Sequence, residues 1–83
     1  MYALWYDRAE CLGRPVDYYL LADRWEGARE HYGVEIRWGE ETASVPPGLT
    51  VSRDGAQELL DRLAKGVVTP VTLWDIVEDW LAE

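Results

Sequence analysis

Cys11 and His31 are the only cysteine and the only histidine of this chain, and they carry its most reactive side chains. A thiol beside an imidazole makes a nucleophile–base pair, which enzymes orient with a third residue. The two positions lie in separate predicted connections, "RAECLGRP" and "EGAREH", and the sequence supplies no orienting residue for them. We therefore expect His31 to be a surface histidine in a turn and the pair to do no chemistry.

Carboxylates four residues apart form the second candidate site. Asp75 and Asp79 share one face of a predicted helix, with Glu78 beside them. Such a group can bind a divalent cation, but exposed acidic helix faces are usually only solvated. A single cysteine rules out the cysteine-rich zinc sites. Neither a glycine-rich phosphate loop nor a serine nucleophile elbow is present. We expect no catalytic, metal or cofactor site, and no enzyme.

Composition narrows the classes of partner. The net charge is −8, from 16 acids and 8 bases, and the chain has no basic footprint for direct contact with nucleic acid. Its apolar stretches are all shorter than a membrane span, and the first residues lack the basic start of a signal peptide. One cysteine in a small domain favours the reducing cytoplasm over secretion.

Length and aromatic content suggest a small domain with a contact surface. A chain of 83 residues predicts one domain, residues 1–83. Five Trp and five Tyr with no Phe is an unusual set. Trp and Tyr combine a large apolar area with a polar tip, which suits half-buried sites and interfaces.

Three runs rich in aromatic and branched residues predict β-strands, at Tyr2–Asp7, Val16–Trp25 and Tyr32–Trp38. The short connections between them favour an antiparallel meander. The next stretch, "GEETASVPPGLT", predicts a loop because of its glycines and its Pro-Pro pair. Residues 49–51 add at most a short edge strand.

Two helices are predicted to follow. Apolar residues recur at helical spacing up to Gly66, with Ser52 or Asp54 as the N-cap. Thr69 caps the second helix, whose first residue is Pro70. Strands first and helices last predict an α+β fold with two layers. It contains a three- to four-stranded antiparallel sheet (a meander) followed by two C-terminal helices packed on one face.

The strand Val16–Trp25 is apolar on both faces, whereas a strand with one solvated face alternates. Even-numbered strand positions are the more consistently apolar, so we assign them to the face under the helices: Tyr2, Leu4, Tyr6, Tyr18, Leu20, Val34, Ile36 and Trp38. A slip of one residue would exchange the two faces.

The opposite face is the candidate functional surface. It groups Trp5, Tyr19, Leu21 and Trp25, with Arg37 among them. Contiguous apolar patches of a few hundred square ångströms usually mark an interaction site. Three kinds of cover remain open: a second copy of the chain, the 39–51 loop folded across the sheet, or a foreign ligand or protein.

The C-terminal part, "LTVSRDGAQELLDRLAKGVVTPVTLWDIVEDWLAE", resembles the end of a family of short uncharacterised bacterial proteins, a domain of unknown function. In that family an extended S-x-D segment leads a leucine-bearing helix, and a Ser/Thr-Pro step opens a last helix ending near D-V-V-E-D-F-L. The matching residues are Ser52, Asp54, Leu60, Leu63, Thr69, Pro70, Leu73, Asp75, Ile76, Val77, Glu78, Asp79, Trp80 and Leu81. A "Y-G-V" match at residues 32–34 is weaker. The resemblance implies the fold and a bacterial or phage origin, but no activity, cofactor or catalytic residue.

Three functions from different classes fit these features. The first is a small non-enzymatic interaction or regulatory protein of a bacterium or phage, homodimeric through the aromatic sheet face. The second is an acidic inhibitor that mimics nucleic acid and binds a partner with a basic surface. Its contact face comprises Asp75, Glu78, Asp79 and Glu83, with Glu58 and Asp61.

The third function is the binding or sequestering of a small molecule. Trp5, Tyr19 and Trp25 would stack on a planar ligand, and Arg37 would bind its anionic group.

Overall fold

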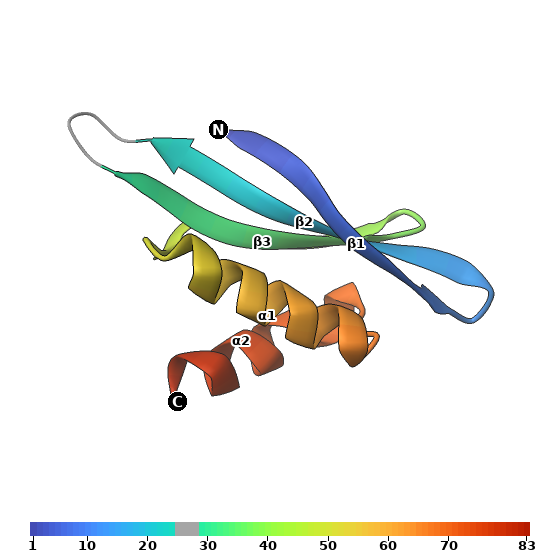
Figure 1. Cartoon of the computed structure of the whole chain (residues 1–83). Helices are drawn as coiled ribbons and strands as arrows, with labels where there is room; N and C mark the ends of the chain where they lie inside the picture. Colours follow the sequence, from blue (N-terminus) through green and yellow to red (C-terminus); the bar gives the residue numbers. More distant parts are fainter. Residues whose placement is uncertain (25–28) are drawn as a thin grey trace.

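The structure is a computed structural model that describes residues 1–24 and 29–83. It contains a sheet of four antiparallel strands in the order β1-β2-β3-β4. The strands are β1 (Tyr2–Cys11), β2 (Arg14–Arg24), β3 (Glu30–Trp38) and β4 (Glu41–Thr50). Two helices follow, α1 (Arg53–Lys65) and α2 (Leu73–Leu81), and both lie on the same side of the sheet (Figure 1). The predicted α+β meander with two C-terminal helices on one face is confirmed.

The β1–β2 hairpin is longer than predicted. Its strands are joined by the two residues Leu12 and Gly13, both with positive φ (53° and 76°). Positive φ at both central positions is the signature of a type I′ turn, whose twist matches that of the flanking strands. Residues 8–11, predicted as part of a connection, therefore pair with residues 14–17.

The stretch 41–50, predicted as a loop, is strand β4, and that prediction was wrong. Pro lacks the N–H that an inner strand must donate, but β4 is an edge strand, where Pro46 and Pro47 are tolerated. Its register shifts between the pairs Val34–Val45 and Tyr32–Thr50. Residues 46–49 therefore bulge opposite Gly33.

This bulge carries β4 over the sheet face that points away from the helices, which we call the outer face. A Cβ built at Gly33 would lie 2.1 Å from the Val45 carbonyl oxygen and 2.7 Å from that of Pro46. Cα atoms of β4 also come within 8 Å of Cα atoms of β2. Strands two places apart in a flat sheet are about 9.5 Å apart. The space of a side chain at residue 33 is thus filled by the backbone of β4.

Local sequence sets the helix ends. The Ser52 hydroxyl accepts a hydrogen bond from the Gly55 N–H (3.0 Å) and caps α1. After Gly66, which is right-handed (φ −84°), the left-handed position is taken by Val67 (φ 47°). Thr69 makes no capping hydrogen bond with its side chain, and the chain enters α2 through a 3₁₀ turn, Pro70–Thr72.

The core lies between the middle of the sheet and the helices. The predicted core residues Tyr18, Leu20, Val34 and Ile36 are buried against α1 and α2. The Tyr18 hydroxyl donates a hydrogen bond to the Val68 carbonyl (2.9 Å), and burial raises the pKa of Tyr18 to about 12. This bond ties β2 to the segment between the helices.

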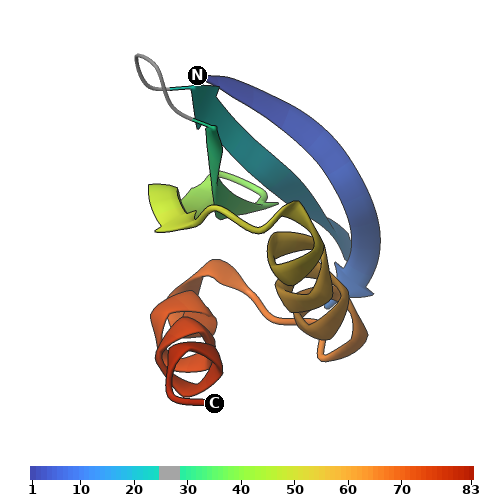
Figure 2. The ribbon, with the colours of Figure 1, turned by 60° about the vertical axis from the view of Figure 1, so that its left-hand side comes forward.

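The sheet is longer than the helix layer that covers it. The 10 residues of β1 span about 33 Å, whereas the 13 residues of α1 span about 20 Å. The first half of β1 rises away from the helices (Figure 2). Tyr2 and Leu4, predicted to lie in the core, are therefore 44% and 40% exposed although they face the helix side.

We expect Gly33→Ala to lower the free energy of unfolding by about 3 kcal/mol, because its methyl group would overlap the backbone of β4. Gly66→Ala is the matched control, since the nearest heavy atoms to a Cβ there are 3.4 Å away and its φ suits any residue. Urea unfolding of both variants measures the difference. Equal stability of the two variants would contradict the arched path of β4.

Candidate functional site

The outer face is organised in rows by the strand register. In one row Trp5 of β1 lies opposite Tyr19 of β2, and Tyr19 lies opposite Glu35 of β3. In the next row Arg8, Asp17 and Arg37 stand opposite one another in the same order of strands. Directly opposed side chains on one face lie within reach of each other. An aromatic pair is thus set beside a row of alternating charge.

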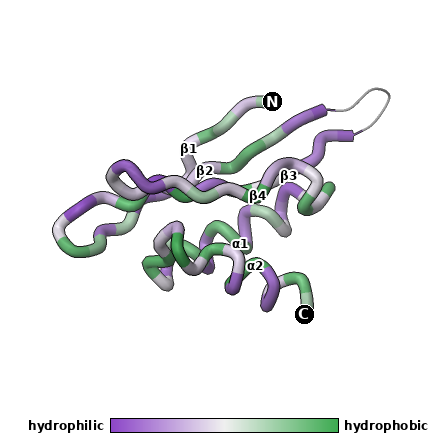
Figure 3. Tube along the Cα trace, turned by 180° about the vertical axis from the view of Figure 1, so that it is seen from behind, coloured by the Kyte–Doolittle hydropathy of each residue, from purple (hydrophilic) through white to green (hydrophobic). Residues whose placement is uncertain are grey.

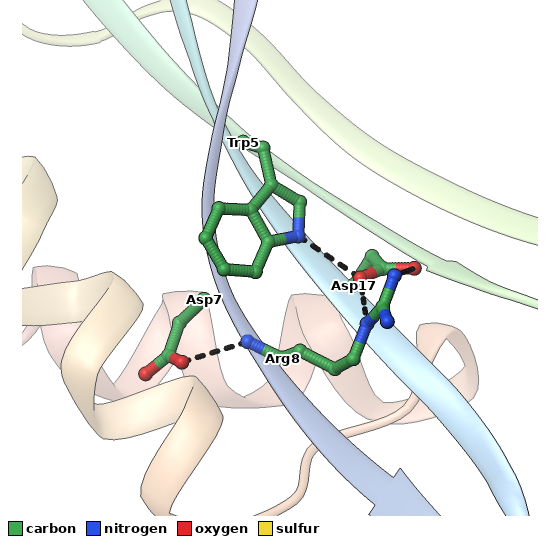
Figure 4. Close-up of polar contacts among 4 residues, drawn as sticks. All are labelled: Trp5, Asp7, Arg8 and Asp17. Carbon is green, nitrogen blue, oxygen red and sulfur yellow. Dashed lines mark hydrogen bonds and ion pairs between the residues drawn. The ribbon is translucent and has the colours of Figure 1, made fainter.

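Asp17 connects the two rows. Its carboxylate accepts hydrogen bonds from the Trp5 indole Nε1 (3.0 Å) and from Arg8 Nε (2.7 Å), as Figure 4 shows. The hydrogen bond from Arg8 lowers the pKa of Asp17 below its ordinary range, and the bond from Trp5 adds to this. The indole of Trp5 is thus fixed at its polar end while its ring remains exposed.

Arg37 is also fixed by contacts with its neighbours on the outer face. Its guanidinium lies 4.2 Å from the centre of the Tyr19 ring, a cation–π contact, and its Nε donates a hydrogen bond to Glu35. Arg37 therefore covers part of Tyr19. A planar ligand between these residues, as in the small-molecule hypothesis, would have to displace that contact first.

The predicted patch is only partly open. Trp5 is 56% exposed, and Tyr19 is half-buried. Leu21 is only 3% exposed; it pairs with Gly33, and the backbone of β4 passes close to that glycine. Residues 41–50 form strand β4 rather than a loop across the patch, and Trp5 stays exposed. Trp25, the remaining member of the predicted patch, lies outside the described residues.

The sequence predicted a strand from Tyr2, but it did not predict that the first side chains of this strand are exposed. Met1, Tyr2, Leu4 and Trp5 are all exposed and are close neighbours along the chain. The run "MYALWY" has no charged side chain, and it was available as a signal. The exposure of this run was not predicted, because the assignment of even-numbered positions to the helix side placed Tyr2 and Leu4 in the core.

The acidic face of α2 is exposed as predicted, but it is not uniform. Glu83 is bound by both terminal nitrogens of the Arg62 guanidinium on α1. Asp75, Glu78 and Asp79 take part in none of the ion pairs found among residues 1–24 and 29–83. Three of the four predicted contact residues thus carry unneutralised charge.

The other residues that could carry chemistry lie far apart. Cys11 pairs with Arg14 and His31 with Asp23, nine positions apart along β2, which corresponds to about 30 Å. The two side chains are too distant to form a nucleophile–base pair. Within the described part of the chain, no three His, Cys, Asp or Glu side chains group as metal ligands do, and no helix is long and apolar enough to cross a membrane.

A hollow lies where the β1–β2 and β3–β4 turns meet. It is lined by Arg14, Trp38, Gly39, Glu40 and Glu41. The indole N–H of Trp38 lacks a hydrogen-bond partner there, but that nitrogen has almost no accessible surface. A ligand in the hollow could not reach this donor without a movement of the indole.

Comparison with known proteins gives one match. The sequence model of a family of unknown function, DUF6514, matches residues 8–83. No curated protein and no solved structure matches the chain. The match agrees with the resemblance to a domain of unknown function, and its range includes the whole C-terminal segment on which that resemblance rests. A bacterial origin stays a prediction.

We expect Asp17→Asn to lower the free energy of unfolding at pH 7 by about 1 kcal/mol, because Arg8 and Trp5 lose a charged acceptor. Since the pKa of Asp17 is lowered in the folded state, its contribution is complete above the ordinary Asp value near 3.9 and is lost as the pH falls through the folded value. The gap between wild type and variant should therefore narrow from pH 5 to pH 2 in urea unfolding. A gap that persists undiminished at pH 2 would assign the effect to packing instead.

Proposed function

We propose that this chain, which belongs to the family of unknown function DUF6514, is a small non-enzymatic interaction protein that forms a homodimer through the outer face of its sheet. The proposal places it in a reducing cytoplasm and in an accessory or regulatory role. The observation that carries it is the exposed ring of Trp5 beside Tyr19, on the sheet face opposite both helices.

The hydrogen bonding of Trp5 favours a contact role. A buried indole N–H needs a hydrogen-bond partner, because an unsatisfied buried donor is costly. In this chain the N–H is already bonded to Asp17. A partner can therefore cover the ring and gain apolar burial without providing an acceptor.

The charges around Trp5 favour a second copy as the partner. Two chains of net charge −8 repel one another over most of their surface. The outer face is different, because Arg8 and Arg37 balance Asp17 and Glu35. Two copies that approach by this face bring arginines as well as carboxylates together, which reduces the repulsion between them.

We expect Trp5→Ser to weaken dimerisation about tenfold or more, as exposed tryptophans at contact sites often dominate the binding energy. Trp74→Ser is the matched control, because Trp74 is similarly exposed (51%) but lies on α2, in the other layer. Sedimentation equilibrium of wild type and both variants gives the dissociation constants, with circular dichroism to confirm folding. A wild type that stays monomeric, or equal effects of the two substitutions, would contradict the proposal.

The unpaired acids of α2 favour a second candidate, an acidic inhibitor of the nucleic-acid-mimic type that binds a basic protein surface. Such binding is steered by charge and weakens as salt rises. Neutralising Asp75, Glu78 and Asp79 together, as Asn or Gln, should lower the affinity for a basic nucleic-acid-binding protein. The same three changes should leave the dimer constant within about twofold, since these residues lie in the helix layer. Unchanged affinity would reject this candidate.

A further inference from the structure

Exposed apolar side chains at the start of β1 lie on both faces of the sheet. Tyr2 and Leu4 share the helix side with their partners Ala22 and Leu20 on β2. Trp5 points to the opposite side, with Tyr19. A partner stacked on the outer face would cover Trp5 and leave Leu4 in water. Only a partner that approaches along the strand edge, in the plane of the sheet, contacts both sides.

The edge itself has free hydrogen-bonding groups. β1 is the first strand in the sheet order and is bonded only to β2 within the described chain. Every second residue of such a strand turns its N–H and C=O outward. The opposite edge, β4, carries Pro46, Pro47 and a bulge, which obstruct regular pairing. Regular edge pairing is therefore open at the start of β1 and obstructed over residues 46–49 of β4.

The first residues of β1 lack the usual protection of an edge. Natural edge strands carry charges, prolines or bulges that prevent pairing with another chain. Residues 1–6 have no charged side chain and no proline. The start of β1 appears without deep purple in Figure 3, beside the strongly hydrophilic neighbouring ends of β2 and β3. A bulge between Trp5 and Asp7 ends the regular segment, which is thus confined to Tyr2–Trp5.

We propose that two copies of the chain pair antiparallel along Tyr2–Trp5 of β1, with the two-fold axis at Leu4, and so join their sheets into one. The inference rests on the proposed homodimer, and it places the contact at the β1 edge beside Trp5 rather than face to face across the outer side of the sheet. It also brings the two Trp5–Tyr19 pairs together on a common outer face.

The position of the two-fold axis follows from which side chains of β1 share a face of the sheet. Opposed residues of an antiparallel pair share a face, so Leu4 can stand opposite Leu4 of the second copy, and Ala3 opposite its Trp5. This register sets the small Ala3 against the large indole on the outer side. On the helix side it buries the two leucines against each other. No charged side chain within Tyr2–Trp5 opposes the contact.

Cysteine cross-linking tests the register. In a Cys11→Ser background, Leu4→Cys places two thiols across the axis, where directly opposed Cα atoms are about 4.5–5.5 Å apart, within disulfide range. Ala3→Cys is the matched control, because two residues at position 3 would be offset along the strands and too distant. We expect air oxidation to give a covalent dimer with Leu4→Cys and little or none with Ala3→Cys on a non-reducing gel.

The outcomes separate this inference from the proposed function. A wild type that is dimeric by sedimentation while neither cysteine variant cross-links, or both do equally, overturns edge pairing and leaves the homodimer. A wild type that is monomeric at every concentration overturns both, and leaves the edge to an extended strand of another protein.

A charge on the edge gives a second test that needs no oxidation. Leu4→Lys should raise the dimer dissociation constant about tenfold or more, because a lysine on an edge strand opposes pairing with a second strand. Val71→Lys on the helix side is the control, since Val71 is also exposed. Equal constants for the two variants would overturn the proposal.

Discussion

The unequal rise of strand and helix governs this structure. A strand advances about 3.3 Å per residue and an α-helix about 1.5 Å, so the 10 residues of β1 extend well beyond the 13 residues of α1. The core can form only where the two layers overlap, around Tyr18, Ile36 and Leu60. Elsewhere the sheet must be covered by other means or stay open, and the exposed aromatic side chains of the sheet, such as Trp5, lie in this uncovered part.

The regions of the sheet that the helices leave uncovered differ in what covers or bonds their side chains. Over Gly33 the backbone of β4 passes across the outer face, and Leu21 beside it is buried. Around Asp17 the polar tips of Arg8 and Trp5 are bonded within the chain. The start of β1 has neither arrangement: its apolar side chains are exposed on both faces and its outer edge is bare within the described chain. In an acidic protein, an edge without charged side chains fits a second copy of itself, which is the basis of the proposed edge pairing.

The sequence predicted the order of the elements and the core residues of β2 and β3. Those two strands pair without a bulge, so even-numbered residues stay on the helix side along their whole length. It did not predict β4, since Pro-Pro-Gly normally interrupts a strand and is tolerated here only at an edge. Burial of Leu21 on the outer face is a tertiary property, which no local sequence pattern encodes. Exposure of Leu4 follows from the length of α1 relative to the sheet, a tertiary property. Of the candidate site, Trp5 and Tyr19 were predicted from the alternation of side chains between the two faces of the sheet. The unprotected edge of β1 was not predicted.

Amide hydrogen exchange of β1 as a function of protein concentration tests the central claim most directly. Pairing along Tyr2–Trp5 would bond the outward N–H groups of that segment, so its exchange should slow as the concentration rises through the dimer dissociation constant. β4 is the internal control, because it forms the opposite edge of the sheet and takes no part in the proposed pairing, so its exchange should not change. Exchange of β1 that is the same at every concentration, in a protein shown to dimerise over that range, would contradict the account.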